Sequence, residues 1–277
     1  MAAKVGDPDA IVTAVRIEPG AKASLDTRDT EDKVGFESEA QADDILDGLR
    51  DEIISLHDKL WAEAKRSVLL VLQGIDASGK DGTIRKVLSG INPQGCRVAS
   101  FKAPSDQEKA HDYLWRVHAE CPPRGQLGVF NRSHYEDVVA ARFVGAADDA
   151  HCRLRYQHIS DFERMLTEEG TTLVKVYLHI SKDEQRERFQ ERIDDPTKNW
   201  KFRERDLEVR KQWDECARVY EEVITETSTE HAPWFVVPGD RKWVRDVVVA
   251  TLLVTTLRRL DPQYPPPDPA IKGLVLP

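Results

Sequence analysis

A glycine-rich segment with one lysine is the first feature of this sequence that could do chemistry. Residues 74–83 read GIDASGKDGT, which fits the GxxxxGK spacing of a loop that cradles phosphate groups. Glycines let successive N–H groups point inward, a following helix adds its positive end, and Lys80 supplies a mobile cation. We predict phosphate contacts from Gly74, Ala77, Ser78, Gly79, Lys80, Asp81, Gly82 and Thr83. A glycine-rich turn without a ligand is the alternative interpretation.

Two acidic side chains distinguish this loop from the common pattern. Asp81 stands where a Ser or Thr hydroxyl usually contacts magnesium, so a metal ion needs another ligand. Asp76 lies inside the loop, where phosphate would repel a carboxylate unless a cation intervened. Asp76 is therefore the first candidate ligand for Mg²⁺, with Mn²⁺ as the other candidate ion. Alternatively, its side chain caps the turn that follows.

A second polar cluster, VFNRSHYED at residues 129–137, follows an apolar run. Arg132 can clamp two phosphate oxygens, and the carboxylates of Glu136 and Asp137 can hold a metal ion or orient an acceptor. We predict a catalytic group of Asp76, Lys80, Arg132, Glu136 and Asp137, in which Asp76, Glu136 and Asp137 are the metal ligands. The alternative is that Glu136 and Asp137 only stabilise the first turn of a helix.

Basic residues around Pro196 form the third feature. Proline lacks a backbone donor, so the charged helical pattern after Ser181 should break there. Phosphoryl transfer needs cations around the equatorial oxygens and a closure that excludes water. We predict a hinged helical lid at about residues 186–211, with phosphate-binding candidates Arg192, Lys198, Lys201, Arg203 and Arg205. A pair of salt-bridged surface helices is the alternative.

Strands and helices in alternation must position these features. The continuous apolar run 68–72 is typical of a buried parallel strand. Further strands are predicted over 97–101, 127–130, 172–180 and 234–237, and helices over 45–65, 82–88, 107–119, 134–143, 153–168, 181–192, 202–224 and 244–260. This order predicts an α/β fold with a mostly parallel five-stranded sheet between helices and a ligand site beyond the carboxyl ends of the strands.

Length and composition limit the domain organisation and the function classes. The 277 residues are 40% hydrophobic, which suits one sizeable core. We expect a polar N-terminal extension over 1–43, a kinase domain over 44–262 and a Pro-rich tail over 263–277. The net charge of −9 argues against indiscriminate nucleic-acid binding.

Membrane and secretory classes are also disfavoured. No apolar run approaches the ~20 residues that span a bilayer, and the N-terminus lacks the order of a signal peptide. The four cysteines lie far apart without a CxxC pair, which predicts neither a zinc site nor a disulfide framework. We therefore expect a cytoplasmic protein that binds neither nucleic acid nor membrane.

Several motifs in order resemble the polyphosphate kinase 2 family across residues 45–260. They are GIDASGKDGTIR, RVASFKAP, DYLWRVH, VFNRSHYEDV, LHISKDEQRERFQERIDDPTKNWKF and APWFVVPGDRKW. The resemblance implies a thymidylate-kinase-like P-loop fold and magnesium-dependent transfer between inorganic polyphosphate and adenine nucleotides (AMP, ADP, ATP), with guanine nucleotides as further candidates. It also implies a homo-oligomer, either a dimer or a tetramer.

The resemblance further implies roles for single residues. Asp76 and the segment 132–137 would shape the metal and nucleotide phosphate site, and Lys80 would steer the transferred phosphoryl group. Lys102, in the RVASFKAP segment, would contact nucleotide phosphate, and the lid cations would hold polyphosphate.

One departure from the family's pattern concerns the acceptor. Relatives specialised for nucleoside diphosphates often carry Trp-Tyr-Asn after the Arg-Ser pair, where this chain has His134, Tyr135 and Glu136. The chain is in this respect similar to the class that accepts both AMP and ADP. Two other functions stay open: an ATP-dependent nucleoside monophosphate kinase, which shares the loop, lid and fold, and a nucleotide-binding regulator without turnover.

Overall fold

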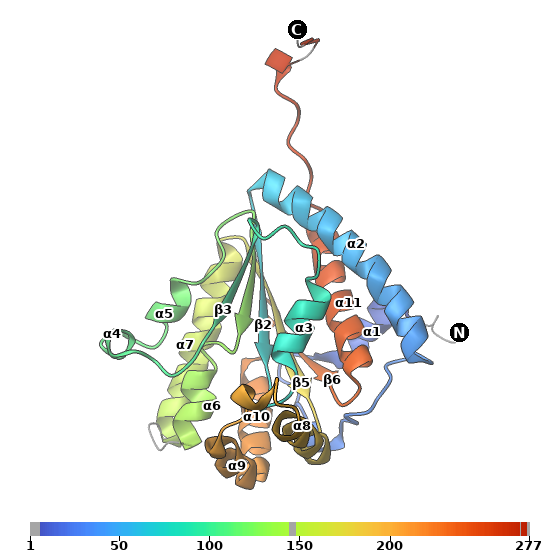
Figure 1. The fold of residues 1–277 in the computed structure, drawn as a ribbon. Coiled ribbons are helices and arrows are strands. Elements are labelled where there is room, and N and C mark those ends of the chain that lie inside the picture. Colours follow the sequence, from blue (N-terminus) through green and yellow to red (C-terminus); the bar gives the residue numbers. More distant parts are fainter. Residues whose placement is uncertain (1–5, 144–147, 272, 276–277) are drawn as a thin grey trace.

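A six-stranded sheet forms the centre of the computed structural model, which describes residues 6–143, 148–271 and 273–275. Its order is β1-β6-β5-β2-β4-β3, and Figure 1 labels β2, β3, β5 and β6. The strands are β1 Arg16–Ile17, β2 Ser67–Gln73, β3 Cys96–Ser100, β4 Leu127–Asn131, β5 Thr171–His179 and β6 Trp234–Pro238. All neighbouring pairs among β2 to β6 are parallel, and β1 pairs antiparallel with β6.

The predicted count of five strands is wrong by one. The additional strand, β1, comes from the first 43 residues and has only two residues, too few to show an alternating pattern. Just before it, α1 (Pro8–Val15) buries Ile11, Val12 and Val15 in the main core. The early part of the chain therefore contributes to the sheet and to the packing beneath it.

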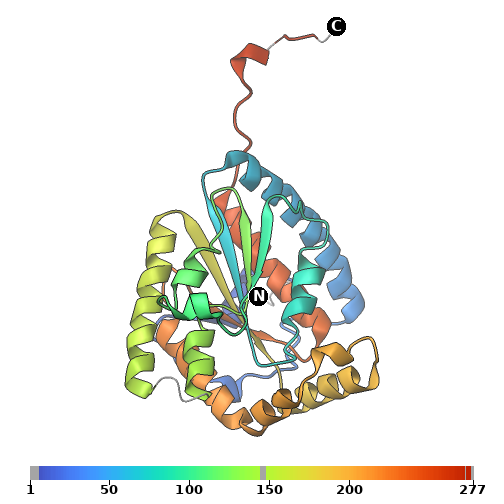
Figure 2. The ribbon, with the colours of Figure 1, turned by 60° about the vertical axis from the view of Figure 1, so that its left-hand side comes forward.

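Helices cover both faces of the sheet (Figure 2). They are α2 Glu39–Glu63, α3 Lys80–Val87, α4 Asp106–Lys109, α5 Trp115–His118, α6 Glu136–Phe143, α7 Asp149–Glu168, α8 Lys182–Asp194, α9 Glu204–Lys211, α10 Trp213–Thr227 and α11 Lys242–Leu260, with short 3₁₀ turns η1 Leu25–Thr27, η2 Asn199–Lys201 and η3 Pro269–Ile271. Side chains of α1, α2 and α11 share one core cluster with the sheet, and those of α6, α7 and α10 share another. No helix of the described ranges is long and apolar enough to cross a membrane.

The central strand β2 shows why its sequence is continuously apolar. Successive side chains of a strand point to opposite faces, so Leu70 and Leu72 enter the core under α11 while Leu69 and Val71 enter the core under α7 and α10. Every residue of β2 is buried. The phosphate loop therefore begins from a strand that is packed on both faces.

Two predicted helices are each interrupted. The segment 107–119 divides into α4 and α5 because the Asp112 carboxylate accepts hydrogen bonds from the backbone N–H groups of Leu114 and Trp115, at 3.0 and 3.1 Å. Such local bonds compete with helix continuation. The segment 202–224 divides at Gln212, which ends α9 and begins α10.

Candidate active site at the ends of the parallel strands

The phosphate loop joins β2 to α3, and its backbone requires glycine at two points. Gly74 has φ +152°, and a Cβ there would lie 2.6 Å from Ser78 Oγ and 2.9 Å from the Leu178 carbonyl oxygen. Gly79 has φ +105°, and a Cβ would meet the Arg245 guanidinium. The loop is thus held tightly by its surroundings, as a rigid cradle of N–H groups requires.

Lys80 begins α3 and turns its side chain back across the loop. Its Nζ donates to the Gly74 carbonyl oxygen at 2.7 Å and lies 3.3 Å from Ser78 Oγ. Burial and the positive charge of Arg132 lower the pKa of Lys80 to about 8. The ammonium group is therefore still mainly protonated at pH 7, and it lies inside the loop.

Arg132 follows β4 and is the centre of the site's charge network. Its guanidinium forms ion pairs with Asp76, in the phosphate loop, and with Glu136, at 3.3 Å. Burial opposes its charge, but Glu136 and Asp76 outweigh that effect and raise the pKa of Arg132. Its backbone is left-handed, with φ +61°, which is unfavourable for a residue with a Cβ. The surrounding contacts must therefore hold it there.

Two of the three predicted metal ligands lie together. Asp76 and Glu136 converge on Arg132, whereas Asp137 turns away and pairs with Arg116 at 3.2 Å. Mg²⁺ is usually held by one or two carboxylates together with waters and substrate phosphates, so the pair of Asp76 and Glu136 fits it. Asp76 and Glu136 thus share one cationic partner, and Asp137 has another. Within the ranges the structure describes, no group of three or more His, Cys, Asp or Glu side chains is arranged to hold a metal.

The remaining predicted phosphate contacts fall into different environments. Asp81 is exposed and accepts a hydrogen bond from Asn131 Nδ2 at 2.6 Å, which links the loop to the end of β4. Thr83 is completely buried. Lys102 has an exposed side chain, and its carbonyl oxygen accepts a hydrogen bond from Arg116 at 2.8 Å.

Burial and charge in the carboxylate pair are linked. Burial raises the pKa of the Glu136 carboxyl above its usual value, against the opposing effects of Arg132 and Lys80. The free energy of the charged form therefore depends on these two cations. A site with partly buried carboxylates facing fixed cations is suited to a ligand that brings both phosphate and a counterion.

Residues of α8 that sequence patterns did not single out support the loop from outside. Arg188 Nη1 donates to the carbonyl oxygens of Ala77 and Ser78 at 3.0 and 2.9 Å, and Gln185 Nε2 donates to that of Asp76 at 2.9 Å. Arg188 lies in the region predicted as a lid, but nothing in its spacing separates it from the exposed Arg186. Only its burial, at 6% exposed, shows that it braces the loop.

The predicted lid cations lie farther out, in the segments that gather beyond the carboxyl ends of the strands (Figure 1). Arg192 packs over the Phe189 ring at 5.5 Å and donates to the Lys201 carbonyl oxygen at 3.3 Å. Lys198 pairs with Asp195 at 3.0 Å. Arg203 is exposed at the start of α9, and the side chain of Arg205 lies outside the described residues.

Comparison with known proteins gives one family. Residues 37–265 match the family described as Polyphosphate kinase 2. The chain is 50% identical over 262 residues to an AMP/ADP-polyphosphate phosphotransferase of Meiothermus ruber, covering 94% of this chain and 98% of that protein. It is 42% identical to an ADP-polyphosphate phosphotransferase of Rhodopseudomonas palustris, covering 92% of each. The crystal structure of Polyphosphate Kinase 2 from Arthrobacter aurescens TC1 superposes with a TM-score of 0.89 at 41% identity, covering 93% of this chain and 92% of that one.

Proposed function

The chain belongs to the polyphosphate kinase 2 family, and we propose on this premise that it transfers phosphoryl groups between inorganic polyphosphate and AMP or ADP. The names of its relatives support the substrates. The structural observation that carries the proposal is the ion-pair bridge of Arg132 to Asp76 and Glu136, directly beside the lysine of the phosphate loop. This is the charge arrangement that phosphoryl transfer needs.

The reaction requires positioning and charge stabilisation, and no covalent enzyme intermediate. In this proposal the loop N–H groups and Lys80 hold the migrating phosphoryl group, and Arg132 orients the nucleotide phosphate. Asp76 and Glu136 would hold Mg²⁺, which when bound supplies charge neutralisation at the phosphate oxygens. Arg188 and Gln185 keep the loop in place while charge shifts along the transferred group.

A single incubation tests the function. AMP or ADP is mixed with polyphosphate and Mg²⁺ in the absence of ATP, and the nucleotide products are separated by chromatography. We expect AMP to be converted to ADP and ATP, and GMP and GDP tested in parallel show the base preference. Product formation only when ATP is supplied would instead indicate a nucleoside monophosphate kinase. Nucleotide binding without any phosphate exchange would indicate a regulator.

The lid is the second part of the proposal. We propose that the outer part of the predicted lid 186–211, from residue 192 onward, closes over the site while Arg188 stays bound to the phosphate loop, and that Arg192, Lys198, Lys201 and Arg203 contact polyphosphate. Arg203 gives the cleaner test, because it is exposed while Arg192 also packs on Phe189. Arg203→Ala should raise KM for polyphosphate roughly 5- to 10-fold, as expected for the loss of one hydrogen bond at an exposed position. Calorimetry should show an unchanged Kd for ADP.

The control for the lid experiment is Arg124→Ala. Arg124 is similarly exposed, at 64%, and makes only a long ion pair of 3.9 Å. If both variants lose the same fraction of their activity with polyphosphate, the effect comes from the surface charge in general, and Arg203 does not contact polyphosphate specifically. Equal losses for polyphosphate and ADP in Arg203→Ala would move Arg203 to the nucleotide site.

Glu136 provides a prediction about the choice of acceptor. Glu136→Asn should lower kcat/KM for AMP at least ~10-fold more than for ADP. ADP fills the acceptor site with its terminal phosphate, whereas the position of AMP depends more on Arg132, which loses one of its two carboxylate partners. The measurement is kcat/KM for both acceptors in the parent and the variant. Glu136→Gln keeps the side-chain length, so it separates loss of charge from loss of reach; a difference below ~1 kcal/mol between acceptors would contradict the idea.

Assembly and location complete the proposal. We propose a cytoplasmic homo-oligomer, a dimer or tetramer, with a kinase domain over 44–262. Light scattering coupled to size-exclusion chromatography measures the mass in solution, and a mass of one chain would remove this part of the proposal.

A further inference from the structure

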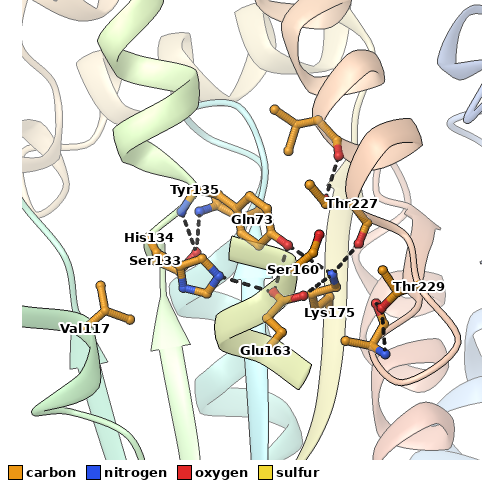
Figure 3. Close-up of polar contacts among 12 residues, drawn as sticks. Gln73, Val117, Ser133, His134, Tyr135, Ser160, Glu163, Lys175, Thr227 and Thr229 are labelled. Carbon is orange, nitrogen blue, oxygen red and sulfur yellow. Dashed lines mark hydrogen bonds and ion pairs between the residues drawn. The ribbon is translucent and has the colours of Figure 1, made fainter. Parts of the chain in front are cut away.

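A buried ion pair lies beneath the segment that carries Arg132 and Glu136. Glu163 from α7 and Lys175 from β5 are both completely buried, and Lys175 Nζ lies 2.6 Å from Glu163 Oε2 (Figure 3). The same ammonium donates to the Tyr135 hydroxyl oxygen at 2.9 Å and to the Thr227 carbonyl oxygen at 2.7 Å. All three of its protons therefore have acceptors.

The other oxygen of Glu163 holds the segment itself. Oε1 accepts from the Tyr135 hydroxyl at 2.8 Å and lies 3.2 Å from His134 Nε2. Nε2 is the ring nitrogen that makes this contact, and Nδ1 has no hydrogen-bond partner among the described residues. Figure 3 shows His134 and Tyr135, from the connection between β4 and α6, meeting Glu163 of α7 and Lys175 of β5. Thr227, at the end of α10, also accepts a hydrogen bond from Lys175. The ion pair therefore joins the β4–α6 connection, α7, β5 and α10.

The residues held by the ion pair lie between Arg132 and Glu136 in the chain. Ser133, His134 and Tyr135 are completely buried and connect Arg132 directly to Glu136. The backbone N–H of Tyr135 also donates to Ser133 Oγ at 3.2 Å, which closes a tight turn. Because Arg132 has an unfavourable positive φ, its conformation persists only where its surroundings fix it. The buried pair holds two of the three residues that follow Arg132, namely His134 and Tyr135.

Stability alone does not explain a buried ion pair. Desolvation of both charges offsets much of their attraction, and well-packed apolar replacements are often as stable or more so. In this pair the attraction between the charges outweighs the effect of burial on Glu163. Burial acts to raise the pKa of Glu163, but Lys175 and His134 hold that pKa below its usual value. A charged pair with five directed hydrogen bonds fixes orientation, which apolar packing does less well.

We infer that Glu163 and Lys175 are positioning residues for the acceptor side of the site, acting through His134 and Tyr135 on the backbone from Arg132 to Glu136. This inference rests on the proposed function. It adds residues that touch no substrate and lie in the core. The lid, whose cations we propose to contact polyphosphate, is not held by this pair, so the effect should fall mainly on the nucleotide.

The first test is Tyr135→Phe, which keeps the ring and removes only the hydroxyl. The ion pair itself stays, because Lys175 retains Glu163 and Thr227 as acceptors, and only one ammonium proton loses its acceptor. We expect kcat/KM for AMP and ADP to fall about 10-fold while KM for polyphosphate changes less than about 2-fold, since small misplacements of a reacting group are costly. An effect equal on both substrates, or below about 2-fold on the nucleotides, would overturn the inference.

The second test separates positioning from stability. Lys175→Met alone leaves a buried carboxylate without its partner and should lower Tm strongly. Adding Glu163→Gln removes the charge but keeps an oxygen for Tyr135 and His134, so Tm should recover. Under this inference nucleotide kcat/KM stays at least about 10-fold below that of the parent. If activity returns together with Tm, the pair is only structural and the inference is wrong.

A matched control and a parent measurement complete the design. Ile53→Ala, in α2 on the other side of the sheet, creates a core defect remote from the segment and should lower Tm without changing the kinetics of the folded enzyme.

Calorimetry on ADP gives a readout that does not depend on turnover. We expect the Kd for ADP to be higher in Tyr135→Phe than in the parent. A parent enzyme without polyphosphate activity contradicts the proposed function, whereas an active parent with a fully active Tyr135→Phe contradicts only the positioning inference.

Discussion

Lys80→Ala is expected to lower kcat at least ~100-fold, the scale on which one preorganised electrostatic contact is lost. The Lys80 ammonium lies inside the phosphate loop and contacts the Gly74 carbonyl oxygen at 2.7 Å. Since the pKa of Lys80 is lowered to about 8, turnover should be measured near pH 7, where the group is charged. The alanine variant loses the contact with the Gly74 carbonyl oxygen but keeps the loop glycines and the hydrogen bonds from Arg188 and Gln185, so the protein should still fold and melt much like the parent.

Lys86→Ala is the control for this prediction. Lys86 lies on the same helix and is half exposed, with a long ion pair of 3.5 Å to Asp43. It should keep the activity of the parent. A Lys80→Ala enzyme that melts like the parent and retains more than about half of its turnover would contradict the assignment of the loop.

Arg132→Ala should lower kcat/KM for AMP and for ADP by at least ~100-fold. The guanidinium bridges Asp76 of the phosphate loop and Glu136 of α6, so its loss removes a cation from the nucleotide phosphate and leaves two carboxylates facing each other. The repulsion between them should also weaken binding of ADP in calorimetry. KM for polyphosphate should change less than kcat/KM for the nucleotides.

Arg132→Lys distinguishes charge from geometry at the same position. A lysine carries the charge but cannot form two paired contacts in one plane, so it should not restore more than about a tenth of the parent activity. Substantial rescue by lysine would show that only a point charge is needed. Near-parental activity of Arg132→Ala would place the acceptor phosphate elsewhere.

Much of the fold could be predicted from short stretches of sequence. The apolar run of β2 followed by GxxxxGK predicts a buried strand, a phosphate loop and a helix. Sequence suffices here because the apolar run and the loop glycines lie close together in the chain. The same local reasoning predicts that Arg132 and Glu136 lie at the end of β4. Parallel strands then bring this end beside the loop, and the ion pair of Arg132 with Asp76 confirms that the two motifs meet.

Other features depend on contacts between residues far apart in the chain. Asp137 and Glu136 are adjacent in sequence, yet only Glu136 pairs with Arg132. Asp137 instead forms an ion pair with Arg116 of α5. The brace from Arg188 to the loop spans more than a hundred residues. The two-residue strand β1 forms only because β6 offers it an open edge.

The buried pair of Glu163 and Lys175 is the strongest case. In sequence, Glu163 sits in a charged helix that would ordinarily be placed at the surface, and Lys175 interrupts an otherwise apolar strand. Neither residue type is expected in a core. The amino-acid sequence alone determines the five parallel strands, most of the helices and the phosphate loop, because those depend on local periodicity and backbone preference. Tertiary packing decides which charges are buried and paired, because the cost of burying a charge is set by the partners that other elements bring to it.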